Sequence, residues 1–210
     1  MTTHGGRGQF IALEGGEGVG KSTQLVALAR VLRDRGLDVV TTREPGGSDG
    51  AERIRDLLLN GPDERWGAEA EALLFAAARA DHVDKVIRPA LLAGRWVISD
   101  RFVDSSLAYQ GGAGGLGIEA VRDINGIAIG EWFPDRTLVL TLPEGGERAR
   151  KRDGEGADRI GGRASGYHEA VAAAFRTLSE AEPERVRLVD ASGSPEEVTQ
   201  RLLDQLADLL

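Results

Sequence analysis

One short segment restricts the possible folds of this 210-residue chain more than any other. Residues 15–22 read Gly-Gly-Glu-Gly-Val-Gly-Lys-Ser and match the pattern G-x-x-x-x-G-K-S/T at every fixed position. An apolar stretch, Gln9–Glu14, precedes it, and apolar residues at helical spacing follow it within Lys21–Arg35. Glycines let such a loop wrap an anion with backbone N–H groups, and a helix that begins near Gly20 directs the positive end of its dipole to the same anion. The segment therefore predicts a site for the phosphate groups of a nucleoside triphosphate.

The side chains of this loop have separate expected tasks. We expect Lys21 to neutralise the β- and γ-phosphates of ATP and Ser22 to hold Mg²⁺, which makes magnesium the expected cofactor. The residues expected to bind ATP are Gly15, Gly16, Glu17, Gly18, Val19, Gly20, Lys21, Ser22 and Thr23. A glycine-rich turn with no ligand is the alternative interpretation, and the lysine and the flanking patterns argue against it. The motif leaves the phosphate acceptor open, since water, a protein or a small molecule would all be compatible.

Strand and helix patterns alternate along the rest of the chain. The expected strands are Gln9–Glu14, Leu37–Thr42, Arg95–Ser99, Arg136–Leu142 and Arg185–Asp190, and the expected helices are Lys21–Arg35, Ala68–Leu92, Gly117–Gly130, Gly166–Ala181 and Pro195–Leu210. Because strands separated by helices form parallel βαβ units, we predict an α/β fold: a P-loop three-layer α/β/α arrangement with a five-stranded parallel sheet flanked by helices. The length suits one domain, so residues 1–210 are expected to form a single P-loop domain.

Local signals refine this outline. The long helical stretch Ala68–Leu92 should break near Pro89, which has no backbone N–H. Ser194 is the expected N-cap of the last helix, followed by a proline at the first helical position. The glycine-rich segments Gly111–Gly117 and Gly154–Gly162 are expected to be mobile loops rather than linkers between domains.

Composition excludes several other classes of protein. The formal net charge is −8 at pH 7, which disfavours a nucleic-acid polymer as partner. The chain has no cysteine, so disulfides, thiolate zinc sites and a cysteine nucleophile are excluded, and a reducing, cytoplasmic location is expected. The longest apolar run, residues 72–78, is too short to span a membrane, and Met1–Gly8 lacks the apolar core of a signal peptide. His4, His82 and His168 show no metal-binding spacing, so no metal other than nucleotide-bound Mg²⁺ is expected.

Two further segments place polar residues at the ends of predicted strands. Asp100 and Arg101 directly follow Arg95–Ser99, at the sheet edge where α/β folds bind ligands. Asp100 is expected to hold Mg²⁺, through water or directly, or to orient an attacking oxygen, and Arg101 to clamp a phosphate; an exposed ion pair is the alternative interpretation. Thr42–Gly47 reads as a strand end followed by a Pro-Gly-Gly turn. This puts Arg43 at the same edge, although on its own it would be an ordinary loop cation.

The order of these segments resembles that of the thymidylate kinase family, whose members phosphorylate dTMP to dTDP. The matching segments are Phe10–Gln24 (FIALEGGEGVGKSTQ), Thr42–Gly47 (TREPGG), Leu74–Arg79 (LFAAAR) and Ser99–Gly112 (SDRFVDSSLAYQGG). Weaker agreement continues through Arg148–Ile160 and Val189–Ala191, so the resemblance covers the chain from Phe10 to its end. Many families share the phosphate loop, whereas the other three segments in this order are far more specific. The resemblance implies an ATP- and Mg²⁺-dependent dTMP kinase of dTTP biosynthesis that forms a homodimer.

The resemblance also implies how the acceptor nucleotide is held. The substrate-binding residues would be Glu17, Arg43, Phe75, Arg79, Arg101, Ser105, Ser106, Tyr109 and Gln110, with the two arginines at strand ends on the acceptor phosphate. Phe75 would stack on the thymine ring, although its place on an apolar helix face also fits a core residue. Arg79 would hydrogen-bond the base at O4, Glu17 would approach the 3′-hydroxyl of the deoxyribose, and Tyr109 would crowd its 2′ position.

Phosphoryl transfer requires little covalent chemistry from the protein, because the dTMP oxygen that attacks the γ-phosphorus is already anionic near neutral pH. The expected catalytic residues are Lys21, Asp100, Arg101, Arg152 and Arg159, and an expected lid at about residues 148–162 contains Arg148, Arg150, Arg152 and Arg159. In the family the catalytic arginine comes from the phosphate loop or from the lid. Here the loop has Gly18 and no arginine, so we expect the lid subtype, with Arg152 and Arg159 as first candidates. A solvated basic helix end is the alternative interpretation of this run.

Two positions depart from the family pattern: Thr141, where relatives often carry an acidic residue, and Gly161, where many carry glutamate. Another nucleoside or nucleoside-monophosphate kinase is the first alternative function; a nucleoside kinase would need Asp100 or Glu44 as a base for the 5′-hydroxyl. A P-loop switch or regulatory ATPase is the second, and it would bind nucleotide with little turnover that depends on a monophosphate. The chain has no N-K-x-D motif for guanine, which disfavours a GTPase.

Overall fold

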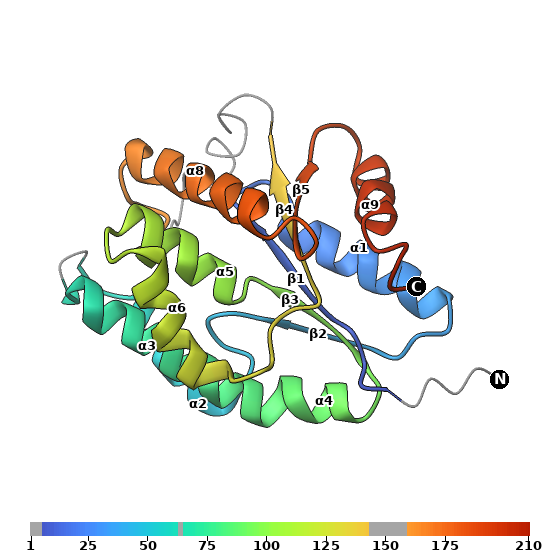
Figure 1. The fold of residues 1–210 in the computed structure, drawn as a ribbon, viewed down its shortest axis with the longest axis horizontal. Helices are drawn as coiled ribbons and strands as arrows, with labels where there is room; N and C mark the ends of the chain where they lie inside the picture. The colour runs from blue at the N-terminus through green and yellow to red at the C-terminus, as the bar shows by residue number, and fades with distance from the viewer. Residues whose placement is uncertain (1–5, 63–64, 143–158) are drawn as a thin grey trace.

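The structure is a computed structural model, and it describes residues 6–62, 65–142 and 159–210. Its centre is a sheet of five parallel strands in the order β2-β3-β1-β4-β5 (Figure 1). The strands are β1 (Phe10–Gly15), β2 (Val39–Arg43), β3 (Trp96–Asp100), β4 (Arg136–Thr141) and β5 (Val186–Asp190). All five were predicted, with their ends displaced by no more than two residues. The predicted α/β fold with a five-stranded parallel sheet is therefore confirmed.

The central strands β1, β3 and β4 are buried on both faces, which explains why they are mostly apolar, whereas the edge strands β2 and β5 are partly exposed. Successive residues of a strand point to opposite faces. On β1, Ile11 and Leu13 pack with α1 (Lys21–Asp34) and α9 (Pro195–Asp204), whereas Phe10 and Ala12 pack with the helices of the other face. The result is the three-layer α/β/α arrangement visible in Figure 1.

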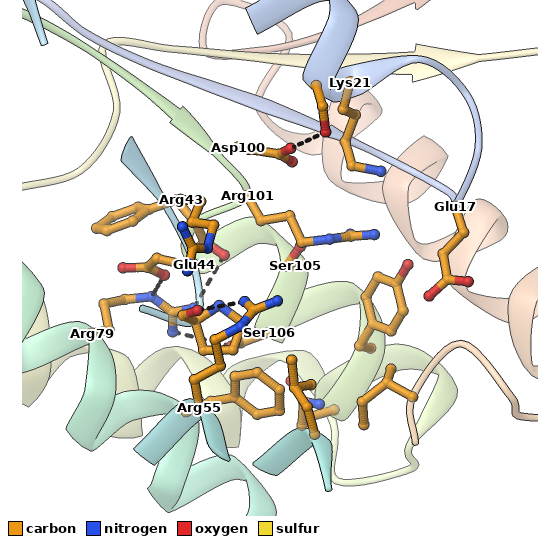
Figure 2. A pocket seen from close by; sticks show the side chains of 18 residues that line it. Glu17, Lys21, Arg43, Glu44, Arg55, Arg79, Asp100, Arg101, Ser105 and Ser106 are labelled. Carbon is orange, nitrogen blue, oxygen red and sulfur yellow. Dashed lines mark hydrogen bonds and ion pairs between the residues drawn. The ribbon is translucent and has the colours of Figure 1, made fainter. Parts of the chain in front are cut away.

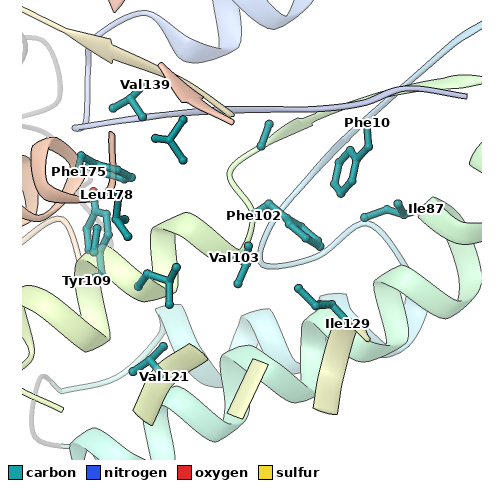
Figure 3. Packing of buried hydrophobic residues seen from close by; sticks show 14 of the residues in the cluster. Phe10, Ile87, Phe102, Val103, Tyr109, Val121, Ile129, Val139, Phe175 and Leu178 are labelled. Carbon is teal, nitrogen blue, oxygen red and sulfur yellow. The ribbon is translucent and has the colours of Figure 1, made fainter. Parts of the chain in front are cut away.

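The second face is covered by a longer series of helical segments. They are α3 (Ala68–His82), η2 (Val83–Ile87), α4 (Arg88–Leu92), α5 (Val103–Ser106), η3 (Leu107–Ala113), α6 (Ile118–Ile129) and α8 (Ser165–Ala181), and α2 (Asp49–Leu59) packs against α3. In this core the rings of Phe10 and Phe102 meet edge to face with centroids 4.8 Å apart, near Ile87, Val103 and Ile129 (Figure 3). Across the described ranges, no helix combines the length and apolarity that a membrane span requires.

The predicted break near Pro89 takes the form of a change in helix type. Residues 68–92 are helical throughout, but η2, which ends two residues before the proline, is a wider π-helical turn. The proline ring crowds the carbonyl four residues earlier, and a widened turn relieves that contact. The chain therefore continues as α4 without leaving the surface of the sheet.

The predicted loop at Gly111–Gly117 is wrong for its first three residues, which belong to η3. The glycines there allow close packing between helices. A Cβ atom on Gly111 would lie 3.1 Å from Cα of Ile118 in α6, and one on Gly112 would lie 2.6 Å from Cβ of Ala174 in α8. The composition alone resembled a loop because glycine serves both purposes.

Helix boundaries were predicted unevenly. The N-cap of α9 is Ser194, as predicted: its hydroxyl accepts the Glu197 N–H at 3.3 Å, and the Glu197 carboxylate accepts the Ser194 N–H at 2.7 Å. The helix ends at Asp204, six residues before the predicted end. Helix α2 was not predicted at all, although Ser48 caps it by accepting a hydrogen bond from the Ala51 N–H.

A buried carboxylate ties α5, the short helix after β3, to the sheet. Asp104 accepts two hydrogen bonds from the Arg185 guanidinium, at 2.7 and 2.8 Å, and one from the Thr137 hydroxyl at 2.7 Å. Thr137 lies on β4 and Arg185 directly precedes β5, so this contact fixes α5 against two strands. Breaking such a pair is costly, because the remaining charge stays buried without its partner.

We expect Asp104→Asn to lower the free energy of unfolding by about 2 kcal/mol, because the neutral amide leaves Glu182 as the remaining carboxylate partner of Arg185. Denaturant unfolding followed by circular dichroism measures this change. Asp84→Asn is the matched control: it removes an exposed carboxylate that pairs with Lys85 and Arg88, and the unfolding midpoint should not move. An Asp104→Asn protein as stable as the unsubstituted one would show that this pair does not hold α5 to the sheet.

Candidate active site

The carboxyl ends of β1, β2 and β3 meet at one edge of the sheet, and a cavity of about 270 Å³ opens there (Figure 2). All nine residues predicted to bind the acceptor line this cavity, together with Lys21, Ser22 and Asp100. The other lining residues, which were not predicted to bind substrate, are Glu44, Pro45, Arg55, Leu59, Phe102 and Ile160. The cavity therefore joins the predicted phosphate loop to the predicted acceptor residues.

The phosphate loop runs from the end of β1 into the first turn of α1, and it contains all residues predicted to bind ATP. Gly15, Gly18 and Gly20 have φ angles of 129°, 66° and 97°, a region that favours glycine. Lys21 is mostly buried, and its Nζ donates to the carbonyl oxygens of Gly15 at 3.2 Å and Gly16 at 2.6 Å. Its ammonium group therefore lies over the loop, where phosphate oxygens are expected.

Ser22 and Asp100 meet across the mouth of this loop. The Ser22 hydroxyl donates to Asp100 Oδ2 at 3.0 Å (Figure 2). A hydroxyl and a carboxylate are the oxygen ligands that Mg²⁺ prefers, and this ion usually completes its shell with water and substrate phosphates. Within the described part of the chain, no three His, Cys, Asp or Glu residues form a metal-binding group. The pair therefore fits a nucleotide-bound Mg²⁺ better than a metal held by the protein alone.

Arg101 occupies a strained position at the end of β3. Its φ is +70°, and it is the one non-glycine residue with positive φ among those the structure describes. Its NH1 donates to the carbonyl of Gly15 and to the Ser105 hydroxyl, both at 3.2 Å, and the guanidinium lies 5.2 Å from the centre of the Tyr109 ring. Strained backbone persists where surrounding contacts enforce it, and it is common at functional sites.

A carboxylate that the sequence reasoning missed enforces this conformation. Glu14 is fully buried and accepts hydrogen bonds from the N–H of Phe102 (2.8 Å), the N–H of Ser105 (3.0 Å) and the Ser105 hydroxyl (2.6 Å). The signal was available, because a glutamate inside an otherwise apolar strand must have partners. Glu14 thus fixes the turn that carries Arg101.

Arg79 is buried beside the cavity, and four contacts fix its guanidinium. Nε donates to Glu44 Oε2 at 2.7 Å, NH1 donates to the Ser106 hydroxyl at 3.0 Å and to Asn125 Oδ1, and NH2 donates to the Phe102 carbonyl at 3.2 Å. Most of its donors are therefore used by the protein, and its orientation is set before any ligand binds.

His82 supports the same group, although the sequence assigned it no role. Its Nδ1 donates to Glu44 Oε1 at 3.0 Å, and its Nε2 shares a hydrogen bond with the Thr42 hydroxyl at 2.7 Å. The sequence contained a signal for this contact, because His82 follows Arg79 by three residues and therefore lies on the same face of the helix. Phe75, on the same helix, is partly buried and lines the cavity, so it is both a core neighbour and a candidate base contact.

Two arginines line the cavity from the end of β2 and from α2. Arg43 donates to both carboxylate oxygens of Glu52, at 2.9 and 3.0 Å, and its side chain is half exposed. Arg55 lines the cavity and donates to the Pro45 carbonyl at 2.7 Å. Arg55 was missed because α2 was not predicted, and only the helix brings it to this edge.

The predicted lid lies mostly outside the described residues, including Arg148, Arg150 and Arg152. Arg159 is described, and its side chain is buried. Its Nε donates to the Leu58 carbonyl at 2.8 Å and its NH2 donates to Glu71. In this arrangement Arg159 does not line the cavity, whereas its neighbour Ile160 does. A catalytic role for a lid arginine stays a prediction.

Comparisons with known proteins agree with this geometry. A family model described as thymidylate kinase matches residues 13–202. The chain belongs to the thymidylate kinase family. A thymidylate kinase from Rhizorhabdus wittichii is 60% identical over 205 residues, which cover 97% of this chain and 99% of that protein. One from Afipia carboxidovorans is 47% identical over 204 residues, which cover 96% of this chain and 90% of that protein.

The fold comparison gives the same family. The crystal structure of thymidylate kinase from Ehrlichia chaffeensis matches with a TM-score of 0.78 and 28% sequence identity, covering 95% of this chain and 99% of that one. The predicted family, fold and enzyme class are therefore confirmed: the chain is a kinase that phosphorylates dTMP in nucleotide biosynthesis. A P-loop switch without an acceptor is accordingly disfavoured.

Burial dominates the titration of two groups in this kinase site. It raises the pKa of the Glu14 carboxyl from 4.5 to about 7, against the opposing charge of Arg101. It lowers the pKa of the Lys21 ammonium from 10.5 to about 7, and the nearby Arg101 charge lowers it further. Phosphate groups beside Lys21 would favour its charged form and reverse that shift.

We therefore expect the binding of MgATP to take up nearly one proton at about pH 8.5, where the free site holds Lys21 mostly neutral. The sign follows because the pKa rises on binding, so the complex holds a proton that the free protein has lost. Isothermal titration calorimetry in buffers of different ionisation enthalpy counts these protons. Lys21→Arg should bind without uptake, because arginine stays protonated. Proton release, or equal uptake by the variant, would contradict the low pKa.

Proposed function

We propose that the chain transfers the γ-phosphoryl group of ATP to the phosphate of dTMP in this cavity, with Mg²⁺ as cofactor. One observation carries the proposal: a single cavity is lined by the phosphate-loop residues Lys21 and Ser22, by Asp100, and by every residue predicted to bind dTMP. Donor and acceptor would therefore meet with their phosphates adjacent, which is the main requirement for phosphoryl transfer.

On the donor side, backbone N–H groups of residues 15–20 and the Lys21 ammonium would bind the β- and γ-phosphates. Ser22 and Asp100 would hold Mg²⁺, directly or through water, and this ion would neutralise charge on the phosphates. We propose that a catalytic arginine from the lid, with Arg152 and Arg159 as candidates, adds further positive charge, since the loop itself has Gly18 at the position available for an arginine.

On the acceptor side, an anionic oxygen of the dTMP phosphate attacks the γ-phosphorus, the bond to the β-phosphate oxygen breaks, and ADP leaves. No strong base is required, because the second pKa of a phosphate monoester is about 6. Arg43, Arg55 and Arg101 would bind the acceptor phosphate and the charge that develops during transfer.

The base and sugar would lie deeper in the cavity. Phe75 would stack on thymine, and Arg79, held by Glu44, would donate to its O4. The buried hydroxyl of Tyr109 lies beside the Arg101 guanidinium and makes no well-aligned hydrogen bond within the described ranges, so it could pair with a polar group of the ligand. Glu17 would approach the 3′-hydroxyl. A cytoplasmic location is part of this proposal, because ATP and dTMP are available there.

A coupled assay of ADP release tests the acceptor. With MgATP we expect strong turnover for dTMP, weaker turnover for dUMP, and almost none for dCMP, dGMP, UMP, thymidine or no acceptor, because Arg79 selects a base carbonyl and the arginine cluster needs a phosphate. Lys21→Met, prepared identically, should lose nearly all activity and so exclude a contaminating kinase. Turnover with thymidine alone would indicate a nucleoside kinase, and ATP hydrolysis that no acceptor changes would indicate a P-loop ATPase.

We also propose that the chain forms a homodimer through α2, α3 and α6. These helices lie side by side and expose Leu57 (40%), Leu73 (56%) and Ile127 (92%). Large apolar side chains exposed on adjacent helices are typical of a protein interface.

Sedimentation equilibrium should therefore give twice the 22.4 kDa mass of one chain. Ile127→Glu should shift the equilibrium toward the monomer, because it puts a charge into an apolar contact. Val26→Glu is the matched control: Val26 is 66% exposed on α1, on the other side of the sheet, and its variant should remain a dimer. A monomeric unsubstituted protein would overturn the proposed interface.

A further inference from the structure

The phosphate loop and the segment 159–163 meet inside the cavity at one close contact. A Cβ atom on Gly161 would lie 2.3 Å from both carboxylate oxygens of Glu17. The carboxylate therefore occupies the space that any other residue at position 161 would fill with its side chain. Both parts belong to the cavity, since Glu17 points into it and Ile160 lines it (Figure 2).

A buried carboxylate on α3 holds the segment 159–163 in place. Glu71 of α3 accepts hydrogen bonds from Arg159 and from Arg163, the latter at 2.7 Å. It also accepts one from the cavity residue Gln110 at 3.0 Å. The Arg159 N–H donates to the Leu59 carbonyl as well, at 3.3 Å. The backbone at residue 161 is thus anchored on both sides, and it cannot easily move away from Glu17.

We propose that Gly161 is a positioning residue for the acceptor nucleotide. Because it has no side chain, the Glu17 carboxylate can rest against the anchored segment, and this contact sets the direction in which Glu17 meets the sugar of dTMP. The inference rests on the proposed binding of dTMP in this cavity, and it adds a residue that no substrate atom needs to touch.

Alanine at position 161 tests this contact without other changes. The φ angle of Gly161 is outside the left-handed region, so alanine can adopt the same backbone. The atoms that a Cβ would meet are the end of a flexible side chain, so Glu17 would turn aside while the fold stays intact. We expect the melting temperature of Gly161→Ala to stay within about 2 °C of the unsubstituted protein.

We expect Gly161→Ala to raise KM for dTMP about tenfold and to leave KM for ATP within about twofold, because only the sugar contact is displaced. Gly166→Ala is the matched control, since a Cβ there would meet nothing within 4 Å, and both constants should be unchanged. A purely structural defect would raise both KM values or lower the melting temperature.

Two further measurements make the assignment specific. In a Glu17→Asp background, whose shorter side chain leaves room for a Cβ, Gly161→Ala should change KM for dTMP by less than about threefold. With 3′-deoxythymidine monophosphate as acceptor, Gly161→Ala and the unsubstituted protein should have the same KM, because the hydroxyl that Glu17 would bind is missing.

The outcomes separate this inference from the function on which it rests. If the unsubstituted protein does not turn over dTMP, the proposed function fails. If dTMP is turned over and Gly161→Ala behaves like Gly166→Ala, or if its effect is the same in the Glu17→Asp background or with the 3′-deoxy acceptor, the positioning role of Gly161 is wrong.

Discussion

The geometry of the site depends on one buried interaction, the carboxylate of Glu14 with the turn that follows β3. Glu14 accepts hydrogen bonds from Phe102 and Ser105, and the Arg101 guanidinium lies 3.9 Å away. The same residue immediately precedes the phosphate loop, so one side chain fixes this loop and the turn that carries Arg101 relative to each other. In a reaction that proceeds mainly by positioning, an error of about 1 Å between these two segments would be costly. The positive φ of Arg101 is the local strain that this link sustains.

At two other places around the cavity, a carboxylate also orients an arginine that lines it. Glu44 holds Arg79, and Glu52 holds Arg43. A buried ion pair adds little stability compared with apolar packing, because both charges lose their hydration. Here the ion pair serves to orient the arginine, because a guanidinium is planar and two or more hydrogen bonds fix both its position and its plane. The cavity is therefore organised before its anionic ligands arrive.

Features encoded in a short contiguous segment could be predicted from the sequence, whereas contacts between distant segments could not. The phosphate-loop motif and the five strands carry their information in short contiguous patterns. The strands are confirmed, and the motif lies between β1 and α1 as expected. Arg55 and the Glu44–His82 contact depend on which helix faces which strand end, and this is settled only by tertiary packing. The glycine content around Gly111 led to the wrong prediction of a loop, because glycine also permits two helices to pack closely, as it does there.

The chain as a whole is acidic, but the charges that line the cavity favour anionic substrates. The net charge of −8 would repel ATP and dTMP at long range, but charges are screened over about 8 Å at physiological ionic strength. Within that distance the lining has five cationic and three acidic side chains. Burial is the main cause of the lowered pKa of Lys21, and the nearby charge of Arg101 lowers this pKa further. Bound phosphates remove this repulsion, so part of the affinity for nucleotide comes from relief of a penalty that the fold imposes on the free protein.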